Sequence, residues 1–293
     1  MIFEVSHRTA YRYRSPVAQS HHLIHVEPKD GERQTVMRHN LLIEPAPASR
    51  LDFKDYFGNQ CSILAIEEDH SELVIHVRST LEVRSALNTD FAATTAWEHI
   101  QQAAVTPTGE LAIGVLQFAC QSRHTPTLPG ALEYARPSFT PGRPVLDAAW
   151  ELTRRIFSDF AFDKTATDLS TPLADVLRRR RGVCQDFAHL ALACLRGFGI
   201  PARYVSGYLL THPPPGIEKL KGADASHAWL AVWSPETDWV DFDPTNGMVP
   251  GEGHITVAYG RDYDDVSPIS GVLIGGGEQT MDVAVDVAVV DQL

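Results

Sequence analysis

The sequence predicts an α+β fold, in which an N-terminal β-sandwich-like domain precedes a core of helices packed on an antiparallel sheet. Residues 1–85 alternate apolar and polar side chains, which is the period-2 pattern of strands. Helical spacing begins at Pro144, and alternation returns from Ala202. Strands and helices that occupy separate runs of the chain are typical of α+β proteins.

These patterns divide the chain into an N-terminal β domain (1–85), a connecting region (86–143) and a core (144–293). Alternation is clearest over 3–13 and 73–83, with a turn at 55–59 between them, and several short strands favour a small sandwich. The connecting region is rich in proline and glycine, and we expect two short helices there.

Three helices are expected in the core. The first begins at Pro144 and places six mostly apolar side chains on one face, namely Leu146, Ala149, Trp150, Thr153, Ile156 and Phe157. A short second helix opens at Thr171 and Pro172, runs into four arginines (178–181) and is broken by Gly182. The third starts near Cys184 and ends around Gly197 and Gly199.

Strands are expected after these helices, at 203–210, 227–233 and 239–242, with a turn over 234–238 between the last two. The alternating tail at 281–289 predicts a final strand. Three consecutive prolines (213–215) indicate a stiff loop near the site described below.

Composition limits the possible functions. The chain has 293 residues, 44% of them hydrophobic, which is ample for a buried core, and a net charge of −12 that opposes nucleic-acid binding. The N-terminus has no secretory signal pattern, and no apolar run approaches the roughly 18 residues of a membrane span. We therefore expect a cytoplasmic protein that binds neither membrane nor nucleic acid, and its oligomeric state stays open.

The cysteines and clustered histidines do not predict a metal or another cofactor. None of the four cysteines forms a Cys-x-x-Cys pair, and we expect three of them to be buried apolar residues. His21, His22 and His25 lack an accompanying acidic cluster, so we expect them on the solvated surface.

Cys184 is the cysteine that the pattern distinguishes. It stands at the expected start of a helix, where unpaired N–H groups and the helix dipole favour a thiolate. The same N–H groups can stabilise the oxyanion that forms when a thiolate attacks a carbonyl. The four arginines upstream add positive potential if they lie close enough.

A nucleophile needs a base, and the hairpin formed by the last two core strands supplies one. If Trp233 faces Trp239, then His227 faces Thr245 and lies diagonal to Asp243, within reach of its carboxylate. Asp241 faces Ala231 instead and is the weaker candidate.

Four blocks carry a resemblance to a known family. Gly182-Val-Cys-Gln-Asp-Phe-Ala-His189, residues 199–208, Asp224-Ala-Ser-His-Ala-Trp229 and Trp239-Val-Asp-Phe-Asp-Pro-Thr-Asn246 resemble the core of the transglutaminase-like superfamily in order and spacing. The β region with its 55–59 motif, and residues 257–263, are similar to flanking parts of bacterial members.

The resemblance implies a papain-like core with Cys184 as nucleophile, His227 as base and Asp243 as the orienting acid, and no cofactor. Gln185, Asp186 and Trp229 are candidates for lining the substrate or oxyanion site, although a helix-start acid explains Asp186 equally well and a core position suits Trp229 better. One departure is Ala231, where many members carry glutamate. His189 is expected to be structural.

We therefore expect a cysteine-dependent enzyme that acts on amide bonds of a protein or peptide through a thioester, foremost as a cysteine protease or amidase. The alternatives are a protein transglutaminase, in which an amine replaces water, and a non-catalytic interaction module that kept the fold.

Overall fold

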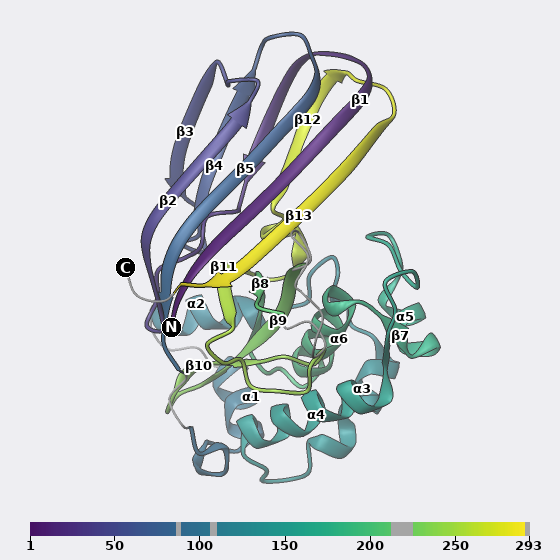
Figure 1. The fold of residues 1–293 in the computed structure, drawn as a ribbon. Helices are drawn as coiled ribbons and strands as arrows, with labels where there is room; N and C mark the ends of the chain where they lie inside the picture. The colour runs from purple at the N-terminus through teal and green to yellow at the C-terminus, as the bar shows by residue number, and fades with distance from the viewer. Residues whose placement is uncertain (86–88, 106–109, 212–224, 291–293) are drawn as a thin grey trace, which may run out of the picture.

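The structure, a computed structural model, describes residues 1–85, 89–105, 110–211 and 225–290. A sheet of long strands projects from one side of a helical part that surrounds a smaller sheet (Figure 1). The expected α+β fold with an N-terminal β domain is confirmed. Within the described residues, no helix is both long enough and apolar enough to cross a membrane.

The larger sheet is built around one long strand. Its strands from the first part of the chain are β1 (Ile2–Ile24), β2 (Gln34–Glu44), β3 (Ser49–Lys54), β4 (Gln60–Ile66) and β5 (His70–Val83), in the spatial order β2-β5-β1-β4-β3. The first half of β1 pairs with β5 and its second half with β4, so the sheet curls where β1 changes partner. With 23 residues in β1, 11 in β2 and 14 in β5, these three strands are longer than the short strands expected.

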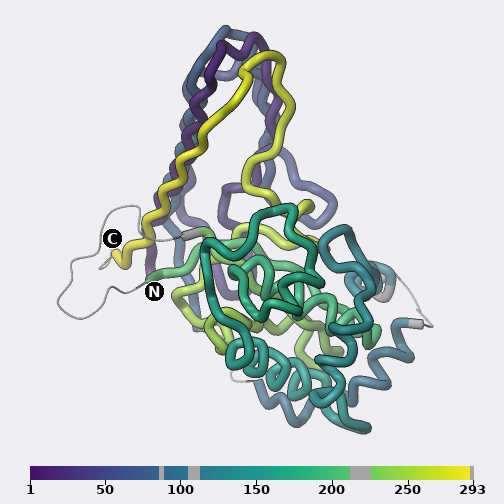
Figure 2. Tube along the Cα trace, turned by 90° about the vertical axis from the view of Figure 1, so that its right-hand side faces the viewer, coloured from purple at the N-terminus to yellow at the C-terminus, as the bar shows by residue number. Residues whose placement is uncertain are grey.

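Two strands from the end of the chain complete this sheet. β12 (Ile269–Gly275) and β13 (Gln279–Val289) both pair with β1, and Phe3 lies opposite Val289. The beginning of the first strand and the end of the last therefore run side by side (Figure 2). The expected final strand is present, but it extends the N-terminal sheet rather than the core sheet.

Six α-helices lie in the described part of the chain: α1 (Trp97–Val105), α2 (Glu110–Leu116), α3 (Pro129–Ala135), α4 (Val145–Asp159), α5 (Leu173–Arg179) and α6 (Cys184–Gly197). The three expected core helices correspond to α4, α5 and α6. The connecting region holds three α-helices instead of two.

Helix α4 buries most of the face that its spacing predicted, with Trp150 half-buried. Leu146, Ala149 and Ile156 are buried, whereas Phe157 is 53% exposed. Gly247 has a left-handed φ of +61°, and a Cβ there would lie 2.6 Å from Phe157 Cγ. Phe157 therefore covers a turn of the core from outside, which its helical position alone could not reveal.

The smaller sheet contains β8 (Ala202–Leu209), β9 (Ala225–Ser234), β10 (Asp238–Phe242) and β11 (His254–Gly260), in the order β10-β9-β8-β11. Trp239 lies opposite Trp233, so the predicted hairpin register is confirmed. The pairing stops at Phe242, before Thr245. Asp243 instead forms a bridge with Met248 across a turn.

Side-chain amides of the N-terminal sheet cap the outer edge of β11. The Asn59 amide accepts from Tyr259 N (2.9 Å) and donates to Tyr259 O (2.7 Å). Gln34 makes the same two contacts with Thr256, at 2.9 and 2.8 Å. An edge strand exposes unpaired N–H and C=O groups, and here two amides satisfy them as another strand would.

Asn59→Ala should therefore destabilise the protein. The substitution leaves the backbone N–H and C=O of Tyr259 without partners in a buried interface, which costs about 1–3 kcal/mol. Urea unfolding measures the change. Asn40→Ala, the same substitution at an exposed position, is the control and should change stability by less than about 0.5 kcal/mol. Equal effects of the two substitutions would contradict the capping role.

Candidate active site

Cys184 is the first residue of helix α6, where the sequence placed it. Its side chain is half-buried. The first N–H groups of a helix have no partner within the helix and point toward the group at its N-terminus. The thiol therefore stands beside backbone donors at a site open to solvent.

Asp186 fixes the start of this helix. Its carboxylate accepts from Val183 N at 2.8 Å and from Thr167 Oγ1 at 2.6 Å, in the manner of a capping box. A Cβ on Gly182 would lie 2.6 Å from Asp186 Oδ2, so only glycine fits before the cap. Burial raises the pKa of Asp186. The buried carboxylate serves the backbone around Cys184, in agreement with the helix-start interpretation.

His227 projects from β9 and is 8% exposed. Its Nε2 lies 2.8 Å from Asp243 Oδ2, and the neighbouring Cys184 side chain also interacts with the ring. Because Nε2 is engaged by the carboxylate, Nδ1 is the nitrogen that remains for the sulfur. The structure thus brings together the three residues that the sequence selected.

The space beside His227 depends on the residue that lies opposite it on strand β8. Gly207 lies opposite His227, and a Cβ at Gly207 would approach Ile255 O to 2.1 Å and Trp229 Cη2 to 2.5 Å. Trp229 is fully buried and packs against this glycine. Trp229 is therefore a core residue, which is the position that the sequence favoured, and it does not form a wall of the substrate site.

Asp243 is fully buried and receives five hydrogen bonds. Oδ1 accepts from the backbone N–H groups of Thr245 (2.9 Å) and Asn246 (3.2 Å). Oδ2 accepts from the side chains of His227, His254 (3.0 Å) and Asn246 (2.7 Å). Donors from its own turn, from β9 and from β11 thereby surround the carboxylate.

The charges of this pair support each other. Burial alone would raise the pKa of Asp243, but the hydrogen bonds from His227, His254 and Asn246 hold it well below its usual range. Burial would lower the pKa of His227, but its contacts with Asp243 and Cys184 outweigh burial and raise it to about 10. An imidazolium beside a sulfur and a carboxylate is the arrangement that nucleophilic thiol chemistry requires.

The remaining residues named from the sequence lie around this centre in other roles. Gln185 is half-buried and follows Cys184 in the first turn. The four arginines each lie near an aspartate: Arg178 and Arg179 near Asp175, Arg180 near Asp159 and Arg181 near Asp163. These exposed pairs offset the positive potential expected at Cys184.

Ala231, the departure from the family pattern, is buried between two charged cross-strand neighbours. Arg203 lies opposite it on β8 and Asp241 on β10. Asp241 Oδ2 lies 3.9 Å from Arg33 Nη1, and burial raises the pKa of Asp241. Asp241 thus supplies a carboxylate beside Ala231, the position where many family members carry glutamate. Asp241 does not contact His227.

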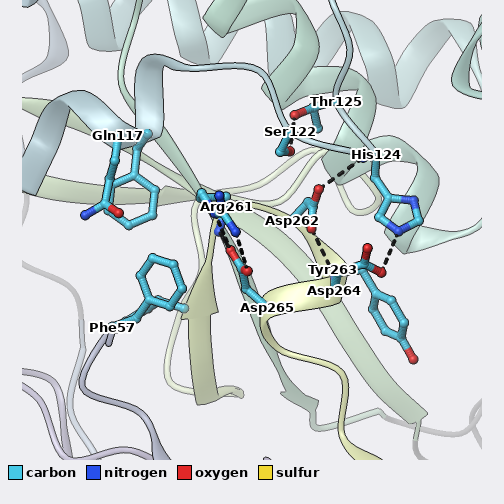
Figure 3. Close-up of polar contacts among 12 residues, drawn as sticks. Phe57, Gln117, Ser122, His124, Thr125, Arg261, Asp262, Tyr263, Asp264 and Asp265 are labelled. Atoms are coloured by element: carbon cyan, nitrogen blue, oxygen red, sulfur yellow. Dashed lines mark hydrogen bonds and ion pairs between the residues drawn. The ribbon is translucent and has the colours of Figure 1, made fainter. Parts of the chain in front are cut away.

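The segment after β11 anchors helix α6 through His189 and His124, and Figure 3 shows the contacts of His124 with this segment. Asp262 accepts from His124 N, and Asp264 pairs with the His124 ring at 2.8 Å. The ring of His189 stacks on His124, with centroids 5.0 Å apart, and His189 Nε2 accepts from Tyr263 N. Burial lowers the pKa of His189 to about 3. His189 is structural, as expected.

Two expectations about cysteine and histidine burial are wrong. Cys120 is exposed, so only Cys61 and Cys194 are buried. His22 and His25 are 7% and 5% exposed rather than solvated, because the curled sheet covers them. His21 is exposed.

His25 lies near two other side chains that can bind metal ions, Asp55 and Cys61. Each already has a partner: His25 Nδ1 donates to Ser267 O, Asp55 Oδ1 accepts from two backbone N–H groups, and Cys61 contacts Asn59 O. His227, Asp243 and His254 form a second such group. The hydrogen bonds given above account for its arrangement.

Sequence reasoning missed Asn246 and His254. Asn246 stands at the end of a block that carried the resemblance, so its position within the turn was a usable signal. His254 was one of thirteen histidines, and it reaches Asp243 from a strand whose pairing no local pattern revealed.

Known families match two parts of the chain. Residues 3–82 match the bacterial transglutaminase-like N-terminal region, and residues 133–244 match the transglutaminase-like superfamily. An uncharacterized protein of Mycobacterium tuberculosis is 40% identical over 97% of this chain and 92% of its own length. An uncharacterized Mycobacterium leprae protein is 34% identical over 97% of each chain.

Two more distant matches carry functional names. A protein-glutamine gamma-glutamyltransferase of Pseudomonas aeruginosa is 39% identical over 72 residues, 24% of this chain and 11% of that protein. The solved structure of a candidate cysteine protease from Cytophaga hutchinsonii superposes with a TM-score of 0.78 at 22% identity, covering 100% of this chain and 91% of the other. The latter confirms the fold.

Gly182→Ala should weaken the cap of helix α6. The added Cβ collides with the Asp186 carboxylate, and loss of a helix cap costs about 0.5–2 kcal/mol. Thermal unfolding measures the loss. Gly31→Ala, where a Cβ meets nothing within 4 Å, is the matched control. A Gly182→Ala protein as stable as this control would contradict the close contact.

The His227 imidazolium should persist to high pH. Its raised pKa stabilises the folded state fully below the unfolded value of about 6.5, and this contribution is lost as pH rises toward about 10. Asp243→Asn removes the carboxylate, so the titration midpoint of His227 should fall. Nitrogen-15 NMR of the ring follows it, and an unchanged midpoint in the variant would contradict the coupling.

Proposed function

This chain belongs to the transglutaminase-like superfamily, and we propose that it is a cysteine-dependent enzyme that attacks amide bonds of a protein or peptide. The observation that carries the proposal is the series from Cys184 through His227 to Asp243, in which the Cys184 side chain interacts with the His227 ring and Asp243 holds Nε2 of that ring. Such a series has the parts of a catalytic triad: a nucleophile, a base and a group that orients the base.

The first half-reaction forms a thioester. The Cys184 sulfur attacks the amide carbonyl carbon and the C–S bond forms, while the C=O electron pair moves to oxygen. Backbone N–H groups at the start of α6 stabilise that oxyanion. The C–N bond then breaks as His227 Nδ1 gives its proton to the departing amine.

The second half-reaction releases the acyl group. Neutral His227 takes a proton from a water molecule, whose oxygen forms a bond to the thioester carbon. The C–S bond breaks, and the thiolate and imidazolium are restored. Asp243 stays ionised throughout and keeps Nδ1 directed at the sulfur, because it holds Nε2. With water as acceptor the enzyme is a cysteine protease or amidase, which we favour.

An amine in place of water would make the enzyme a transglutaminase. The Pseudomonas aeruginosa relative that bears this activity in its name favours this second candidate, over the 72 residues that match. Both reactions share the thioester, and they differ in which nucleophile reaches it.

Four free cysteines fit the reducing cytoplasm that the sequence predicted.

The decisive test combines a peptide library with mass spectrometry, with and without a primary amine. The intact protein should give cleaved or deamidated peptides, or amine adducts if the second candidate holds. Cys184→Ala should abolish the products, since removal of a nucleophile costs about 10⁴-fold or more in rate. Cys120→Ser, which removes the exposed cysteine, should leave the rate unchanged. Equal product from Cys184→Ala and the intact protein would refute the proposal.

The relative rates of cysteine alkylation distinguish an enzyme from a non-catalytic interaction module. At pH 6, iodoacetamide should modify Cys184 faster than Cys120, because only Cys184 has an imidazolium beside it. Peptide mapping reads both sites in one sample. Faster labelling of Cys120 at this pH would favour the interaction module.

A further inference from the structure

A second histidine holds the acid of the site. His254 Nε2 lies 3.0 Å from the same Asp243 oxygen that His227 contacts, and both rings are buried. A carboxylate oxygen only accepts hydrogen bonds, so each ring carries a proton on Nε2. Asp243 Oδ2 therefore lies between two imidazole donors.

The two histidines reach this oxygen from different strands. Asp243 follows β10, at one edge of the core sheet, and His254 begins β11, at the other edge. His227 lies on β9 between them. The Asp243 carboxylate thus links the end of β10 to the start of β11. These two strands lie at opposite edges of the sheet and are not paired with each other.

The orientation of the His254 ring is itself fixed. Its plane meets that of Trp229 edge to face, at 84° and a centroid distance of 5.3 Å. Trp229 in turn rests on Gly207, where no side chain fits. The turn before His254 is held by Arg33, which donates to the carbonyls of Pro250 and Gly251. Few alternative positions are open to the imidazole.

We propose that His254 is a positioning residue, whose Nε2–H holds the Asp243 carboxylate in the orientation that directs His227 Nδ1 at Cys184. This inference rests on the proposed function. Asn246 belongs to the same turn as Asp243, whereas His254 is anchored to another strand, so His254 ties the carboxylate to β11 and Asn246 does not.

Other charged groups near His254 come from each element around it. His227 lies on β9, Asp243 on the turn after β10, Asp241 on β10 and Arg33 on the segment before β2. Asp241 and Arg33 lie close enough to offset each other. The Asp243 carboxylate is the group that contacts the His254 ring nitrogen.

Three variants in a Cys120→Ser background separate positioning from packing. His254→Gln keeps an N–H donor near the position of Nε2, His254→Asn withdraws it, and His254→Leu removes it. Loss of one hydrogen bond to a charged group should lower the rate of Cys184 alkylation at pH 6 about 10- to 100-fold in the Asn and Leu variants. The Gln variant should recover most of the rate. His22→Leu, which removes a buried imidazole from the larger sheet, should leave it unchanged.

The pH profile gives a readout that packing would not move. Removal of a donor raises the pKa of Asp243, so the carboxylate becomes protonated at higher pH. The acid limb of the alkylation profile should therefore shift upward in the Asn and Leu variants and stay in place in the Gln variant. With peptide substrates, kcat should fall while KM changes little.

NMR tests the inference independently of activity. In the intact protein, His254 should carry its proton on Nε2, and a protected, low-field Nε2–H signal of His227 should be lost in His254→Asn. A proton only on Nδ1 of His254, or an unaltered His227 signal in that variant, would overturn the inference even if the enzyme is active. Equal losses of the Cys184 alkylation rate in His254→Gln and His254→Leu would also overturn the inference. Absence of peptide products with these signals intact would instead refute the proposed function.

Discussion

The arrangement of this protein depends on one buried hydrogen bond, between the imidazole of His227 and the carboxylate of Asp243. Neither group is stable alone in a buried site, because burial disfavours both charges. Together they keep an imidazolium beside Cys184. The helix that presents the sulfur packs on the sheet that presents the pair, within one hydrophobic core, so that the three side chains form one site.

Close packing around small residues keeps these elements in place. Gly182 admits the Asp186 carboxylate that caps the Cys184 helix, and Gly207 admits Trp229 beside His227. In both places a methyl group would displace a neighbour of a site residue. The outer edge of β11 is fixed by Gln34 and Asn59 of the larger sheet, so the N-terminal strands also contribute to the position of His254.

Local signals in the sequence predict much of this arrangement. The helix start at Cys184 and the register between Trp233 and Trp239 follow from nearby residues, and together they are enough to select Cys184, His227 and Asp243. Such local signals do not show which strands pair when the strands are far apart in the sequence. The tail strand could join either sheet, and the burial of His22 follows only from the way the long strands curl. For the same reason, nothing in the local pattern distinguishes His254 from the other histidines.

In the proposed mechanism, Cys184 becomes covalently attached to the acyl group of an amide substrate. Acid quenching during turnover, followed by intact mass measurement and peptide mapping, detects this attachment. We expect an added acyl mass on the peptide that contains Cys184, released by hydroxylamine as a thioester would be. Product formation without that adduct, or an adduct confined to Cys120, would contradict it.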